Sequence, residues 1–181
     1  MENITKAEKN KMALTQGLIL GLIYIVLSTS TNLVVGNFIA FYAVKLVGYI
    51  LYFVLLGILA TRIRKANGGY IEFREIFGAI FIMLLVAGTM SYLYNFLYVY
   101  VIDPQYMMKI KTSTITFMEH MKMKDDQIEM TSKNFDEQLE LAKKFNFGNN
   151  VMTFMQAILV DCIFGLIVSA IVKKNKPVFG E

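Results

Sequence analysis

The sequence predicts an all-α integral membrane protein: a four-helix bundle with an external helical hairpin between the third and fourth spans. The first observation is composition, because the 181 residues are 56% hydrophobic with a mean hydropathy of +0.51, whereas soluble domains are about 45–50% apolar. The second is the presence of four apolar segments that reach the length of about 20 residues needed to cross a bilayer. The third is the clustering of lysine and arginine between these segments.

The boundaries of the spans follow from where charges and turn residues interrupt the apolar segments. Residues 12–44 carry no charge and are too many for one crossing. This stretch is interrupted by the polar residues 28–32 and then by the Gly36-Asn37 pair, which predict a tight turn between two spans. We therefore predict four spans in a single membrane domain covering 1–181: about 13–34, 38–61, 76–102 and 150–172.

The distribution of basic residues predicts the orientation. Lysine and arginine are concentrated before the first span, between the second and third, and after the fourth, whereas the turn between the first two spans carries none. Since basic residues favour the cytoplasmic side, we expect a multi-pass protein of the bacterial inner membrane with both termini in the cytoplasm. These basic residues are Lys6, Lys9 and Lys11, then Arg62, Arg64, Lys65 and Arg74, then Lys173, Lys174 and Lys176.

The remaining segment, 103–149, is predicted to lie outside and to be helical. Asp103-Pro104 is typical of an N-cap followed by proline at the first helical position, and Asp126 with Glu129 is typical of a capping box for a second helix. Apolar residues, several of them methionine, recur at three- or four-residue spacing in both halves. We expect the two apolar stripes to cover each other or to lie on the membrane, with a partner-binding surface as the alternative.

Several kinds of chemistry are excluded by residue counts and missing motifs. The chain has one histidine and one cysteine, Cys162, which provide no metal-ligand set and no internal disulfide. No nucleophile elbow, phosphate-binding loop or dinucleotide fingerprint is present. We therefore expect no enzymatic activity, no cofactor and no metal. The net charge of +4 is too small to indicate nucleic acid, so the expected partners are the lipid bilayer and a second copy or another membrane protein.

Two ionisable residues lie within predicted spans, Lys45 and Asp161. A charge near the bilayer centre costs roughly 2.5–3.5 kcal/mol, so such residues usually face a partner, a bundle interior or a water-filled cavity. At 1.5 Å per residue their depths differ by roughly 7 Å, which allows an ion pair. The alternatives are that Lys45 extends to the outer interface and that Asp161 is a structural carboxyl. Polar residues at helical spacing complete a candidate intramembrane site of Asp161, Lys45, Asn95, Ser91 and Ser169. On the second span, Tyr49 and Tyr52 share a stripe with Lys45, and we expect this stripe to face Asp161 as well.

Small residues mark two further features. Ala13, Gly17 and Gly21 form a face that lets helices approach closely, either within the bundle or between copies. Gly68 and Gly69 follow the second span, where a helix commonly ends in a residue with positive φ. We interpret this pair as a cytoplasmic hinge, and a gating element is the alternative.

The order of motifs resembles a known family. A basic end to the second span precedes Gly68-Gly69-Tyr70-Ile71, the third span contains Tyr94-Asn95, and Asp103-Pro104 with Tyr106 precedes a charged helical segment. Over about residues 10–175 the chain resembles domain-of-unknown-function family 4199, four-span bacterial membrane proteins found mainly in Bacteroidota. The resemblance implies a compact integral protein of the bacterial inner membrane. It brings no established activity, so no site residue is transferred.

Two functions are consistent with these features. The first expectation is a non-enzymatic scaffold or accessory subunit that makes contacts through the external hairpin and the small-residue face. The alternative is a small oligomeric transporter or channel that uses Asp161 as a proton- or cation-linked site. Four spans leave little room for a pathway within one chain, so this alternative requires at least a dimer.

Overall fold

The computed structural model describes residues 4–143 and 147–176 and is built from helices throughout these ranges. Four helices are long and apolar enough to cross a membrane, and two shorter ones form the predicted hairpin between the third and fourth spans. Residues 144–146 of the predicted external segment lie outside the described residues. The elements are α1 (Lys6–Asn32), α2 (Phe38–Ala66), α3 (Phe73–Leu97) continued by the π-helical η1 (Tyr98–Ile102), α4 (Tyr106–His120), α5 (Asp125–Lys143) and α6 (Phe147–Val172).

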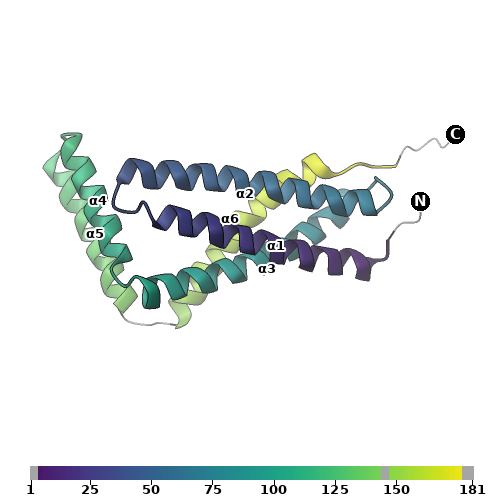
Figure 1. Ribbon diagram of the computed structural model, residues 1–181, viewed down its shortest axis with the longest axis horizontal. Coiled ribbons are helices and arrows are strands. Elements are labelled where there is room, and N and C mark those ends of the chain that lie inside the picture. The colour runs from purple at the N-terminus through teal and green to yellow at the C-terminus, as the bar shows by residue number, and fades with distance from the viewer. Residues whose placement is uncertain (1–3, 144–146, 177–181) are drawn as a thin grey trace.

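Figure 1 shows the four long helices as one elongated bundle with different elements at its two ends. The start of α1, the end of α6 and the α2–α3 link lie at one end, and the α4–α5 hairpin lies across the other. The three segments rich in lysine and arginine therefore gather at one end, which we call the basic end; the opposite one is the hairpin end. Within the bundle, α3 packs against α1 and α6, and α2 packs against the same two helices.

The end of α2 is fixed by a glycine cap. Gly68 has a φ of +73° and Gly69 a φ of +86°, a region that residues with a Cβ adopt only at a cost of roughly 1–2 kcal/mol. The Gly69 amide donates to the Arg64 carbonyl at 3.0 Å, which is the long hydrogen bond of a Schellman motif. The predicted hinge pair therefore satisfies backbone groups at the end of a helix.

The α2–α3 link is also joined to the C-terminal tail. Arg64 donates a side-chain hydrogen bond of 2.8 Å to the carbonyl of Val172, the last residue of α6. Ile71 and Lys174 exchange two backbone hydrogen bonds, of 2.8 and 3.0 Å. The basic end thus holds α2, α3 and α6 together through backbone groups as well as through side-chain packing.

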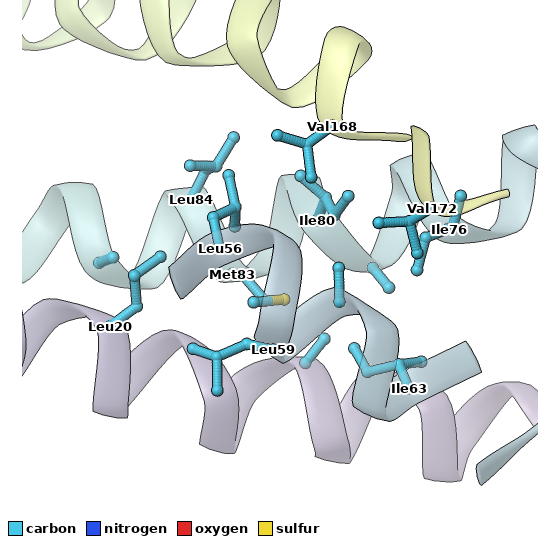
Figure 2. Packing of buried hydrophobic residues seen from close by; sticks show 14 of the residues in the cluster. Leu20, Leu56, Leu59, Ile63, Ile76, Ile80, Met83, Leu84, Val168 and Val172 are labelled. Carbon is cyan, nitrogen blue, oxygen red and sulfur yellow. The ribbon is translucent and has the colours of Figure 1, made fainter. Parts of the chain in front are cut away.

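The main cluster of buried hydrophobic residues lies in the half of the bundle nearest the basic end. Figure 2 shows side chains from all four long helices meeting there. Because lipid tails are as apolar as leucine, close van der Waals packing rather than water exclusion holds such helices together. The labelled core residues are Leu20 from α1; Leu56, Leu59 and Ile63 from α2; Ile76, Ile80, Met83 and Leu84 from α3; Val168 and Val172 from α6.

The hairpin helices begin at different residues from those the sequence predicts. α4 begins only at Tyr106, whose amide donates to the Asp103 carbonyl at 2.9 Å, while the Asp103 carboxylate pairs with Lys109 at 2.7 Å. α5 begins at Asp125, so Asp126 lies inside its first turn and accepts from the Gln127 amide at 2.9 Å. Both predicted caps are therefore wrong, because each helix begins at another residue and each aspartate side chain has a different partner from the one that the motif assigned to it.

Contacts with the bundle and between its two helices fix the hairpin. Phe117 of α4 stacks on Phe38 at the start of α2, with ring centroids 4.1 Å apart. Lys111 of α4 pairs with Asp136 of α5 at 2.6 Å. At the junction with η1, burial raises the pKa of the Tyr106 phenol to about 12, so this phenol stays neutral at physiological pH. The hairpin therefore crosses the end of the bundle instead of extending α3 and α6 (Figure 1).

Candidate functional site

A cleft of about 360 Å³ runs between α3 and α6 in the half of the bundle nearest the hairpin end. Each of these helices presents one face to it over roughly three turns, and α1 and α2 complete the wall with tyrosines. We call this cavity the outer cleft. Its polar side chains, apart from the tyrosines, are Ser91 and Asn95 from α3 and Asn150, Thr153 and Asp161 from α6.

Residue size along α3 and α6 explains why the cleft forms where it does. At Gly165 a Cβ would lie 3.0 Å from Leu84 and 3.3 Å from Ile80, so the two helices approach closely there. Farther toward the hairpin end, the rings of Tyr92 and Phe154 lie between them with centroids 5.3 Å apart. The close approach at Gly165 therefore lies on the basic-end side of the cleft, and the two rings hold α3 and α6 apart on the hairpin-end side.

Asp161 lies midway along the membrane-crossing part of α6 and lines the cleft. Lys45, its predicted partner, is on the exposed surface of α2, where its ammonium lies 5.5 Å from the centroid of the Phe41 ring, one turn nearer the hairpin end. No ion pair joins Lys45 and Asp161, both of which belong to the part of the chain that the structure describes. The structure thus shows Lys45 extending outward along its helix, and the Asp161 carboxylate reaches the cleft without a basic neighbour among the described residues.

Asn95 and Ser91 are the two predicted site residues that share the cleft with Asp161. The Asn95 amide group accepts from the Ser28 hydroxyl at 3.4 Å and donates to the Tyr24 phenol at 3.3 Å. The Ser91 hydroxyl donates to the carbonyl of Ala87 at 2.7 Å within its own helix. Asn95 therefore connects α3 to α1 at the cleft wall.

Ser169 lies away from the cleft. It is on α6, two turns from Asp161 toward the basic end, and it is fully buried. Its hydroxyl donates to the Gly165 carbonyl at 2.6 Å, so its polar group is satisfied within the helix. The four-residue spacing correctly puts the two side chains on one stripe, but the close approach of α3 and α6 at Gly165 separates them.

The predicted small-residue face on α1 packs inside the chain. Ala13, Gly17 and Gly21 are all buried. A Cβ at Gly17 would lie 2.9 Å from the Met83 carbonyl oxygen, and one at Gly21 would lie 2.7 Å from the Met90 sulfur. The face therefore brings α1 against α3, and contact with a second copy cannot use it without opening the bundle.

Sequence reasoning missed part of the cleft lining. On α6, Asn150 and Thr153 share a helical face with Asp161, so their spacing is a signal that could have identified them. Tyr92 could not be identified in this way, because its place in the cleft depends on how α3 crosses α6. Tyr49 and Tyr52 line the cleft with Asp161, as their stripe on the second span predicts. The cleft residues that the sequence did not indicate are Tyr24, Tyr92, Tyr100, Asn150 and Thr153, with the apolar lining around them.

Comparison with known proteins gives a family but no activity. The family model described as protein of unknown function (DUF4199) matches residues 15–174. No curated protein and no solved structure matches the chain. The chain belongs to the DUF4199 family.

Proposed function

We propose that this member of the DUF4199 family is a non-enzymatic carrier of the bacterial inner membrane that moves a proton or small cation by way of Asp161. Both termini lie in the cytoplasm, so the outer cleft faces the external side. The gathering of three basic segments at one end of the bundle supports this orientation, because lysine and arginine are retained on the cytoplasmic side.

The observation that carries the proposal is the position of Asp161 on the wall of the outer cleft. A carboxylate at the centre of a bilayer requires an opposing charge, hydrogen-bond donors or water. Its predicted basic partner, Lys45, lies over Phe41 instead. A proton or cation that enters the cleft supplies the missing positive charge, and a concave site with few polar groups is the usual form of a small-ligand site.

The carrier acts as an oligomer in this proposal. The half of the bundle nearest the basic end is filled by side chains such as Leu56, Met83 and Leu84, which are fully buried. A pathway from the outer cleft to the cytoplasm therefore requires rearrangement of this core or a surface shared with a second copy.

Flux through reconstituted vesicles tests the proposal. Proton uptake and sodium uptake are measured under an imposed gradient for the unaltered protein, for Asp161→Asn and for Asp126→Asn. Asp126→Asn is the matched control, because it makes the same chemical change at a residue of the hairpin, away from the cleft. We expect flux of one ion to fall at least tenfold in Asp161→Asn and to persist in Asp126→Asn. Vesicles without flux, or an equal flux in Asp161→Asn, would refute the carrier.

A second candidate function is the scaffold or accessory subunit, favoured by methionines at the tip of the hairpin. Met121 and Met130 are 62% and 64% exposed, and exposed methionines adapt to several partner surfaces. A photocrosslinker at Met130 should capture one membrane protein in cells, whereas one at Phe117, which stacks on Phe38, should not. Equal capture from both positions, or none, would count against the scaffold.

A further inference from the structure

The walls of the outer cleft are mainly aromatic. Tyr24 and Tyr52 meet edge to face with ring centroids 5.9 Å apart, and the Tyr92 ring meets Phe154 at 5.3 Å. Aromatic faces attract cations, and the attraction grows when the cation is desolvated. The other rings that line the cleft are those of Tyr49, Phe96 and Tyr100.

The same walls are poorly suited to a bare divalent metal ion. Calcium and magnesium prefer six or more oxygen ligands, several of them carboxylates or waters. The cleft contains one carboxylate, that of Asp161, and no group of three or more His, Cys, Asp or Glu gathers anywhere in the part of the chain that the structure describes. One carboxylate among aromatic rings is instead the arrangement that recognises an organic ammonium group.

A second cavity, an apolar groove, is lined by residues of the same two helices and shares a wall with the cleft. It has a volume of about 340 Å³ and shares Tyr92, Phe96, Asn150 and Phe154 with the cleft. Thr89 and Leu93 of α3 and Val151 of α6 complete its wall. Since α3 and α6 cross the membrane, this groove borders lipid and suits a hydrocarbon chain.

Cleft and groove together define an amphipathic site. Phe154, in their shared wall, is seven residues from Asp161 on α6, or about 10 Å at 1.5 Å per residue. We propose, on the basis of the proposed carrier function, that the ligand is an amphipathic organic cation. Its ammonium group lies beside Asp161 among the tyrosines, and its apolar chain lies in the groove beyond Tyr92. The hydrogen bond of 2.9 Å from the Tyr92 phenol to Asn150 spans the boundary between the two parts.

Calorimetric titration of the protein in lipid nanodiscs, with empty nanodiscs as the blank, tests this assignment. The probe is octyltrimethylammonium, and its two parts are tested separately as tetramethylammonium and 1-octanol. We expect octyltrimethylammonium to bind at least tenfold more tightly than either part. In Asp161→Asn, the affinity for octyltrimethylammonium should fall to that for 1-octanol. In Asp161→Glu, which keeps the negative charge, the affinity should stay within a few-fold of that of the unaltered protein. This pair of results would show that the loss in Asp161→Asn comes from the missing charge and not from a change in the fold. Val151→Ser should weaken octyltrimethylammonium several-fold and leave tetramethylammonium unchanged.

The results separate this inference from the carrier proposal. Equal affinity for octyltrimethylammonium and 1-octanol, or full affinity in Asp161→Asn, overturns the amphipathic cation. If proton or sodium flux that depends on Asp161 is nevertheless present in vesicles, the carrier stands with a different ligand. If that flux is also absent, both proposals fail.

Discussion

The two halves of the bundle are built from the same four helices but pack differently. In the half nearest the basic end, α1, α2, α3 and α6 all contribute fully or nearly fully buried side chains. In the half nearest the hairpin end, α3 beyond Ala87 and α6 before Gly165 contribute no buried residue among those described, and the outer cleft lies between them. One half is closed by packing, and the other is open at the outer cleft.

The sequence of α3 shows how one helix serves both halves. Its first part is rich in Ile, Met, Leu and Ala, which interlock with neighbouring helices, and its last part is rich in Tyr, Ser and Asn. The contacts between α3 and α1 change along the bundle as well. Near the basic end the two helices approach closely at Gly17, and near the hairpin end they are joined by hydrogen bonds such as the one of 2.7 Å between the Thr29 and Tyr94 hydroxyls. Interhelical hydrogen bonds in membranes average only about 0.6 kcal/mol, so stability should come mainly from the packed half.

Truncating a leucine in each half gives the largest expected difference. Leu84 is fully buried, whereas Leu93, farther along the same helix, is 56% exposed. We expect Leu84→Ala to lower the free energy of unfolding by about 2–5 kcal/mol because it leaves a cavity, and Leu93→Ala to change it by less than about 0.5 kcal/mol. Unfolding in mixed micelles with increasing SDS measures both. Equal losses would mean that the halves are packed alike.

Adding one methyl group tests the close approach of α1 and α3. Because a Cβ at Gly17 would lie 2.9 Å from both the Met83 carbonyl oxygen and the Val86 Cβ, Gly17→Ala should cost about 1–3 kcal/mol. Gly78→Ala is the matched control, since a Cβ there meets nothing within 4 Å. The same unfolding assay applies. A Gly17→Ala protein as stable as Gly78→Ala would show that α1 and α3 are farther apart.

The smallest effect is expected in the hairpin, whose two helices are joined by a partly exposed ion pair. Asp136→Asn removes the pair with Lys111 and should cost about 0.2–1 kcal/mol. Hydrogen exchange should then speed up in α4 and α5 and stay unchanged in the packed half. Glu129→Gln, which removes an exposed pair within α5, serves as the control. Faster exchange in α3 would mean that the hairpin stabilises the bundle more than its contacts indicate.

The fold was largely predictable from the sequence, and the site only in part. Apolar stretches identify the four spans, and the basic segments identify which span ends lie at the same end of the bundle. Both are readable because an apolar segment in lipid must satisfy its own backbone hydrogen bonds and therefore forms a helix. Asp161, Asn95 and Ser91 were identified from polarity within spans. The separation of Ser169 and Lys45 from Asp161 was not predictable, since it depends on where Gly165 brings α6 against α3 and on the direction in which a lysine side chain extends. The predicted caps of the hairpin helices were wrong because a local sequence motif does not show which of several available groups an aspartate side chain will bind.

Access of water to the depth of Asp161 is the most direct test of the central claim, that the outer cleft is open to the external side and closed toward the cytoplasm. In a Cys162→Ser background, Ala157→Cys places a thiol in the cleft one turn from Asp161, and Ala79→Cys places one in the packed half, where Ala79 is 3% exposed. A membrane-impermeant thiol reagent added outside spheroplasts should modify the first and leave the second unmodified. Modification of Ala157→Cys only from the cytoplasmic face of inverted vesicles, or equal modification of both thiols, would contradict the account.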